Sequence, residues 1–258
     1  MGKGIRLDTP APFENFFRHE SGKLVAVLTR AFGAHNLQLA EDVVQDSLLK
    51  ALEHWKFHGI PENPSAWLFT VARNKALDVV RKEKHLKEFS KEISVLLKSE
   101  YSATATLQEI ISSEQIEDEQ LRMMFVCCHP SVAAEGQVAL ILKTLCGFSI
   151  AEIAHAFFTN EETITKRLYR AKEQFRQQSI AFELPEAEEL QPRLENVLTA
   201  IYLIFNEGYH ASHNPSIVRE ELIEESLRLG KMLADNRSTQ KPSTFALLAL
   251  LCFNAARV

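Results

Sequence analysis

The sequence contains little glycine and little proline, with nine of each among 258 residues. Both residues interrupt helices, so their scarcity leaves long stretches of the chain without a helix breaker. Leucine, alanine, glutamate, lysine and glutamine are plentiful instead. Apolar residues recur at spacings of three and four through most of the chain. These features predict an all-α fold.

Cysteine is equally scarce, and the four that are present show no CxxC spacing, so we expect reduced thiols rather than a disulfide framework. The run Cys127-Cys128-His129 does not predict a metal site, because consecutive residues of a helix point about 100° apart and no second ligand pair has zinc spacing. The sequence also lacks a glycine-rich phosphate loop and a convergent Cys–His pair. We therefore expect no cofactor, no metal and no enzymatic activity.

Long hydrophobic runs are missing as well. No apolar run approaches the roughly 20 residues that a bilayer span requires, and the N-terminal sequence MGKGIRLDTPAPFENFF has no signal-peptide core. These absences predict a cytoplasmic protein without a membrane partner. The last residues, ALLALLCFNAARV, form an apolar helical pattern with no cap, so we expect a partner for them beyond Val258.

Positive charge is confined to two short segments, although the formal net charge is -5. The segment Arg73–Lys91 contains seven basic and three acidic residues, and the segment Lys166–Arg176 contains five basic residues and one acidic residue. The flanking segments Glu109–Glu119 and Glu183–Glu195 are strongly acidic. Such a distribution fits a protein that touches DNA at two defined places, although a solvated helix face has the same composition.

The composition divides the chain into four parts. Residues 1–90 form a first helical unit, and residues 91–120 form a polar, Ser/Thr-rich and acidic linker with weak helical stretches. Residues 121–181 form a second helical unit, and residues 182–258 form a helical extension. Within the extension, an acidic link precedes a helical segment that begins at Arg193. We also expect a helix to end near Asn206–His210, with Gly208 in the left-handed conformation.

The second unit contains a helix-turn-helix pattern. Ser149 with Glu152, and Thr159 with Glu162, form two capping boxes that predict helices over residues 150–157 and 160–178. The faces that pack together are formed by Ile153, Ala154, Phe157, Ile164, Leu168, Ala171 and Phe175. In a major groove the opposite face would place Thr163, Lys166 and Arg167 near base edges, and Arg170 and Lys172 near phosphates.

The first unit is expected to hold helices near Phe13–Phe32, Leu39–Trp55 and Pro64–His85, with a surface loop over Lys56–Asn63. The buried stripe of the second helix is expected to consist of Ala40, Val44, Ser47, Leu48, Ala51 and Trp55. Its other face carries Asp42, Gln45, Asp46 and Leu49, and is either plain surface or a docking face. The third helix turns Leu68, Ala72 and Val79 inward. Its other side carries groups suited to unstacked bases and to the DNA backbone, namely Trp67, Arg73, Asn74, Asp78, Arg81 and Lys82.

Two segments together resemble a known family. The sequence DVVQDSLLKALEHW, followed by a loop and AWLFTVARNKALDVVRK, resembles region two of the bacterial sigma-70 family, and Ser149–Arg176 resembles its region four. Two such regions joined by a short linker resemble the extracytoplasmic-function (ECF) sigma factors. The resemblance covers roughly Pro12–Ala181.

The resemblance implies a role for each of these surfaces. Asp42, Gln45, Asp46 and Leu49 would dock on the clamp helices of the RNA polymerase largest subunit. The loop Lys56–Asn63 would capture a flipped base of the minus-ten element, while Arg73, Asn74, Asp78, Arg81 and Lys82 line the melted strand. Base capture offsets an unstacking cost of a few kcal/mol. Thr163, Lys166, Arg167 and Arg170 would read the minus-thirty-five element.

Two features depart from the common pattern. The recognition helix starts with Glu161 and Glu162, which either complement the helix dipole or accept a hydrogen bond from a cytosine amino group. The extension resembles a subgroup with a C-terminal helical, tetratricopeptide-like domain, which implies an intramolecular regulator. The alternatives to a sigma factor are a helix-turn-helix regulator that works without polymerase, and a helical interaction protein.

Overall fold

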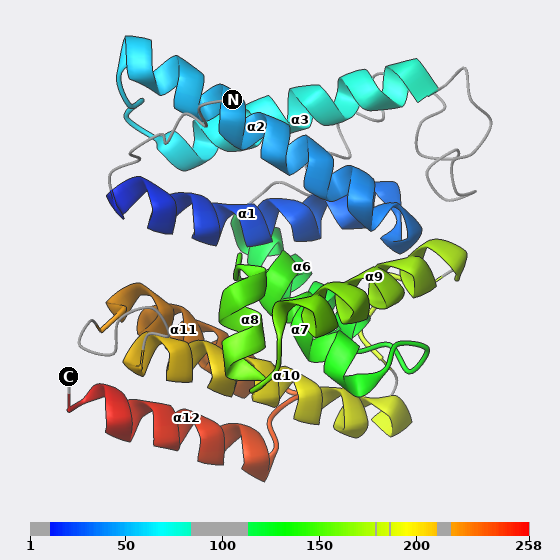
Figure 1. Ribbon diagram of the computed structural model, residues 1–258, viewed down its shortest axis with the longest axis vertical. Helices are drawn as coiled ribbons and strands as arrows, with labels where there is room; N and C mark the ends of the chain where they lie inside the picture. The colour runs from blue at the N-terminus through cyan, green and yellow to red at the C-terminus, as the bar shows by residue number, and fades with distance from the viewer. Residues whose placement is uncertain (1–10, 84–112, 179, 186, 211–217, 258) are drawn as a thin grey trace.

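The computed structural model describes residues 11–83, 113–178, 180–185, 187–210 and 218–257. Every regular element within these ranges is a helix, which confirms the all-α prediction. Figure 1 shows three tiers, with α1–α3 at the top, α6–α9 in the middle and α10–α12 at the bottom.

The top tier contains α1 (Ala11–Phe32), the short 3-10 helix η1 (Ala34–Asn36), α2 (Leu37–His58) and α3 (Pro64–Glu83). The predicted apolar stripe of α2 is confirmed: five of its six residues are buried and Leu48 is half-buried. The expected cap of α3 is also present, because the Ala66 N–H donates to Asn63 Oδ1 over 3.0 Å. On α3, Leu68 and Ala72 are buried as expected, whereas Val79 is only half-buried and Val80 takes the inner position.

The expected loop over Lys56–Asn63 is shorter than predicted. Lys56 and His58 belong to the last turn of α2, which ends at His58 with Gly59 as its C-cap. Gly59 adopts a φ of 78°, and its N–H donates to the Trp55 carbonyl over 3.0 Å. A glycine in this conformation closes a helix without steric cost, so Gly59 rather than Lys56 marks the boundary.

The middle tier contains α6 (Ser113–Cys127), α7 (Ala134–Thr144), α8 (Ile150–Ala156) and α9 (Glu161–Gln177). Helix α6 begins inside the segment 91–120 that the sequence marks as a linker. Its residues Glu119 and Gln120 are both buried at 1% exposure, so this part of the acidic segment packs inside the molecule. Helix α7 is buried on nearly every side and forms the centre of the tier.

The helix-turn-helix of α8 and α9 is confirmed with one changed cap. Ser149 and Glu152 form the predicted capping box, with both reciprocal bonds present. Helix α9, however, is capped by Asn160, whose Oδ1 accepts from the Thr163 N–H over 2.8 Å, so the predicted Thr159 box is wrong. Asparagine is at least as good a cap as threonine, which moves the helix start by one residue.

The bottom tier contains α10 (Ala187–Tyr209), α11 (Glu220–Asp235) and α12 (Pro242–Ala255). Helix α10 begins six residues before the predicted Arg193 and includes Pro192 near its start. Helix α10 ends at Tyr209, within the predicted range, but Gly208 is helical and not left-handed, so that part of the prediction is wrong. A Cβ atom there would lie 3.0 Å from atoms of Ile223 and Leu222, which shows that Gly208 permits close packing of α10 on α11.

A single hydrophobic core runs through the three tiers. Helix α1 packs on α6 as well as on α2, and α10 packs on α7. The top and middle tiers approach closely at Gly22 of α1, where an added Cβ would lie 2.0 Å from the Leu145 carbonyl oxygen. Only glycine fits this contact, which explains a glycine in the interior of a helix.

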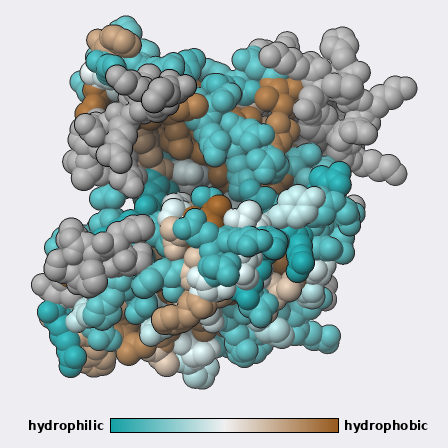
Figure 2. Space-filling model, viewed as in Figure 1, coloured by the Kyte–Doolittle hydropathy of each residue, from teal (hydrophilic) through white to brown (hydrophobic). Residues whose placement is uncertain are grey.

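The outer surface is mostly hydrophilic on the face shown in Figure 2, with hydrophobic strips in the upper tier and along the bottom edge. On α12 the side chains of Phe245, Leu250 and Phe253 are exposed. Among the described helices, none combines the length and the apolarity that a bilayer crossing needs.

Candidate polymerase and nucleic-acid interfaces

The polar face of α2 is open to solvent at every predicted position. Asp42 accepts a hydrogen bond from Gln38 over 3.0 Å, and Asp46 forms an ion pair with Lys75 of α3 over 2.9 Å. Gln45 is exposed, and Leu49 is 55% exposed on the same face. An exposed leucine within an acidic and amide surface has the composition of a docking face for a basic partner.

The end of α2 carries a group of rings that the sequence reading missed. The imidazoles of His54 and His58 stack with centroids 4.2 Å apart, and Trp67 of α3 lies 5.1 Å from His54. Phe57 is 78% exposed in the same turn, and Ile60 is exposed just after Gly59. The four-residue spacing of the two histidines on a helix is the sequence signal for this group. Flat exposed rings of this kind can stack on unpaired bases.

The predicted outer side of α3 is partly open. Asn74 and Asp78 are exposed, while Trp67 and Arg73 are half-buried. Arg81 and Lys82 belong to the last turn of α3, but their side chains lie outside the described residues. The four described residues lie along α3, and Trp67 near its start contacts the rings at the end of α2.

The recognition helix α9 presents its predicted face outward. Lys166 and Arg170 are exposed and Thr163 is half-buried. Lys166 pairs with Glu162 over 2.6 Å, and the Arg167 guanidinium lies 5.6 Å from the ring centroid of Phe157. These contacts give two cationic side chains a nearby partner on or beside the same helix. Arg167 and Arg170 also line a cavity of about 340 Å³ beside the turn that precedes α7.

The same recognition helix touches α2 near its other end. The Lys172 ammonium donates to Glu41 Oε2 over 2.5 Å and to Gln38 Oε1 over 3.3 Å. Thr144 at the end of α7 donates to the second oxygen of Glu41 over 3.2 Å. Glu41 therefore joins three helices through both of its carboxylate oxygens.

A second ionic group joins all three tiers around Glu152 of α8. Arg18 of α1 lies 3.6 Å from its carboxylate, and Arg219, which precedes α11, lies 2.6 Å from it. Burial opposes ionisation of Glu152, but the Ser149 N–H and the two guanidinium groups outweigh it and lower the pKa to about 2. The Glu152 carboxylate is thus ionised at any physiological pH.

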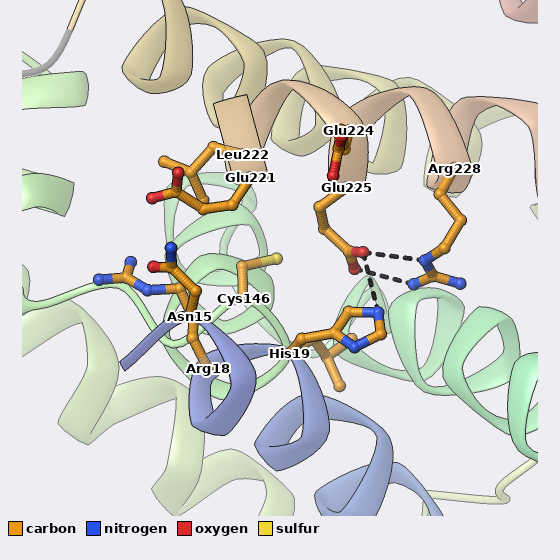
Figure 3. Close-up of a pocket in the computed structure, with 10 residues that line it drawn as sticks. Asn15, Arg18, His19, Cys146, Glu221, Leu222, Glu224, Glu225 and Arg228 are labelled. Carbon is orange, nitrogen blue, oxygen red and sulfur yellow. Dashed lines mark hydrogen bonds and ion pairs between the residues drawn. The ribbon is translucent and has the colours of Figure 1, made fainter. Parts of the chain in front are cut away.

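A third group lies at a cavity of about 390 Å³ between α1, α11 and the end of α7 (Figure 3). Glu225 of α11 accepts from Arg228 and lies 3.4 Å from His19 of α1, while Arg228 also donates to Gln120 of α6 over 2.7 Å. The extension is therefore bound to both other tiers by charged side chains.

The buried thiols have no reactive character. Burial raises the pKa of Cys128 to about 12 and raises that of Cys127 well above its usual value. Over the described part of the chain, no group of three or more potential ligands is placed to hold a metal ion.

The fold is that of an all-helical protein with a helix-turn-helix and a second helical unit whose α2 carries an exposed polar face. Residues 16–86 match the family described as sigma-70 region 2, and residues 193–258 match a family of unknown function. The chain is 30% identical over 133 residues to the ECF RNA polymerase sigma factor SigL of Mycobacterium tuberculosis, covering 51% of this chain and 70% of that protein.

An uncharacterized protein of Rhizobium meliloti is 35% identical over 239 residues, which are 91% of this chain. The chain spans 56% of the length of that relative. No solved structure matches the chain. The chain belongs to the sigma-70 family of transcription factors, among those of the ECF type.

Proposed function

We propose that this sigma factor binds bacterial core RNA polymerase through α2 and starts transcription at promoters that it reads with α3 and α9. The observation that carries the proposal is the open face of Asp42, Gln45, Asp46 and Leu49, within the segment that matches sigma-70 region 2. A DNA-binding protein that works alone has no need for such a face next to a nucleic-acid surface.

The minus-ten contact is proposed for the end of α2, the turn 59–63 and α3. There Trp67 and the exposed rings beside it offer stacking surfaces, and Arg73, Asn74 and Asp78 lie farther along the same helix. Stacking of an extruded base on such a ring is worth about 1–3 kcal/mol, which is comparable to the cost of unstacking it. The chain therefore needs no nucleotide hydrolysis and no catalytic residue for this step.

The minus-thirty-five contact is proposed for the outward face of α9. Thr163, Lys166 and Arg167 lie on the first half of the helix, which reaches base edges when a recognition helix enters the major groove. Arg170 follows and would hold a phosphate. Residues 1–90 and 121–181 would then be the two promoter-binding regions, with residues 182–258 as an intramolecular regulatory part. Its site of action would be the bacterial cytoplasm.

The test is transcription in vitro with bacterial core RNA polymerase on fragments of the native genome. The intact chain is expected to yield promoter-specific transcripts. Asp46→Arg is expected to abolish them by placing a cation on the docking face, and Arg167→Gln to weaken them at the DNA step. Pull-down of core enzyme separates the two effects, because Arg167→Gln leaves core binding unchanged.

Glu195→Arg is the control for Asp46→Arg, since it makes the same charge change at an exposed position of α10, outside the predicted face of α2. Equal loss in both variants would mean a general charge effect rather than a docking face. If the intact chain binds duplex DNA but never binds core enzyme, the sigma assignment of these surfaces fails. A regulator that works without polymerase would then be the better explanation.

A further inference from the structure

The turn between α8 and α9 contains a residue with a strained backbone. Phe158 adopts a φ of 50°, and among the described residues it is the only one other than glycine with a positive φ. The other positive values belong to Gly33, Gly59 and Gly147. A side chain in the left-handed region costs free energy that glycine does not incur. The chain therefore accepts at Phe158 a cost that it avoids at the other three positions.

Contacts within the chain do not explain the choice of phenylalanine. The Phe158 N–H donates to the His155 carbonyl over 3.0 Å, and the Thr159 N–H donates to the Ala154 carbonyl over 2.9 Å. This pair of bonds commonly ends a helix at a left-handed residue, and glycine would form it equally well. The Phe158 ring is 95% exposed, so packing does not offset the strain. Strained residues cluster at functional sites, which indicates that the ring contacts something outside the chain.

The position of the turn places this ring beside the proposed DNA surface. Asn160 caps α9 two residues after Phe158, and the first half of a recognition helix lies in the major groove. The ring centroid of the preceding Phe157 lies 5.6 Å from the Arg167 guanidinium. The turn therefore lies against the side of α9 that carries Arg167, which is proposed to meet base edges. A ring exposed at this point lies at the rim of the groove when α9 is bound.

The chemistry of the ring narrows the choice of partner. A phenyl ring cannot hold a phosphate, and the exposed Glu161 and Glu162 place two carboxylates directly after the turn. The apolar group that the major groove displays is the C5 methyl of thymine, and phenylalanine is among the side chains that contact it. We propose that Phe158 contacts a thymine methyl group in the minus-thirty-five element and so contributes to the choice of promoter. This inference rests on the proposed DNA-binding role of α9.

The test removes the methyl group and the ring in turn. The intact chain, alone and with core RNA polymerase, first selects short duplexes from a pool of randomised sequence. Each thymine of a selected duplex is then replaced by deoxyuridine, which lacks only the C5 methyl, and affinity is measured by fluorescence anisotropy. We expect one replacement to weaken binding of the intact chain about 4-fold, which corresponds to one buried methyl group. Phe158→Gly is expected to bind the thymine and deoxyuridine probes equally well.

Phe158→Gly should also gain stability, which distinguishes a binding residue from a structural one. Because glycine relieves the backbone strain, its melting temperature should rise by about 2–4 °C while the sensitivity to deoxyuridine disappears. Phe158→Tyr keeps the ring and is expected to keep that sensitivity. Phe253→Ala removes a ring that is 76% exposed on α12, and it should leave the sensitivity unchanged.

An equal response to deoxyuridine in the intact chain and in Phe158→Gly overturns the contact, as does the absence of any sensitive thymine. If Phe158→Gly instead fails to retain core RNA polymerase in a pull-down while its response to deoxyuridine is that of the intact chain, the ring docks on a protein and the proposal is wrong. Selection of no duplex by any variant refutes the DNA-binding role of α9 itself.

Discussion

Glu152 shows how much a single buried carboxylate contributes at the junction of the three tiers. Its pKa is about 2 in the folded chain, against an ordinary value of 4.5. Because the pKa is lowered on folding, the ionised form stabilises the fold at every pH above the ordinary value. That stability is lost as the pH falls from 4.5 towards 2, and its full size is on the order of 3 kcal/mol.

We therefore expect Glu152→Gln to lower the free energy of unfolding by about 3 kcal/mol at neutral pH, because Arg18 and Arg219 lose their shared anion. At pH 3 the difference from the intact chain should be much smaller. Denaturant unfolding at the two pH values measures this, with the exposed Glu188→Gln as the control. An equal loss at both pH values would show that the carboxylate charge is not the cause.

Cysteine reactivity gives a second prediction at the residue scale. Cys127, Cys128 and Cys146 are buried, whereas Cys252 is exposed on α12. Because burial raises the pKa of the first three thiols, they contain almost no thiolate under native conditions. Iodoacetamide at pH 8 should modify Cys252 alone, and mass spectrometry should find the other three modified only after unfolding. Native modification of Cys146 would contradict the packing at the cavity of Figure 3.

At the scale of elements, the start of α9 offers a direct comparison between two neighbouring side chains. Asn160 caps the helix in the structure, although the sequence pattern predicted Thr159. Asn160→Ala should therefore cost about 1 kcal/mol of stability, and Thr159→Ala only a few tenths. Equilibrium unfolding of the two variants decides between the caps, and a larger loss in Thr159→Ala would favour the pattern over the structure.

Local patterns predicted most of the helices and the inward faces of α2, α8 and α9, because these depend on spacing within one element. Two errors are local, the Thr159 cap and the loop boundary at Lys56, where a neighbouring residue serves as the better cap. The other errors arise where a distant segment decides the local structure. Gly208 has the sequence context of a helix end, but it is kept helical by its close packing on Leu222. The Glu41–Lys172 contact joins residues 131 positions apart, and no local pattern contains such a pair. The exposed residues of the candidate site were predictable because their exposure depends on the helix period alone and not on a distant segment.

At the scale of the whole molecule, the two regions proposed to bind promoter DNA share one core instead of lying apart. Gly22 is the point where α1 approaches the Leu145 carbonyl too closely for any side chain. Glycine weakens an isolated helix by about 1 kcal/mol relative to alanine, so α1 itself would be more stable with alanine. The glycine is explained by the contact between the tiers and not by the helix.

Gly22→Ala should consequently stabilise α1 but force the top and middle tiers apart. A compact chain of this length has a radius of gyration of about 18 Å, which small-angle scattering of the intact protein should reproduce. The variant should give a larger radius and should unfold in two transitions rather than one, because the regions lose their shared core. Ser21→Ala, at a half-buried neighbouring position, is the control. An unchanged radius together with a single, more stable transition would show that α1 and α7 can yield locally and that the shared core does not depend on this contact.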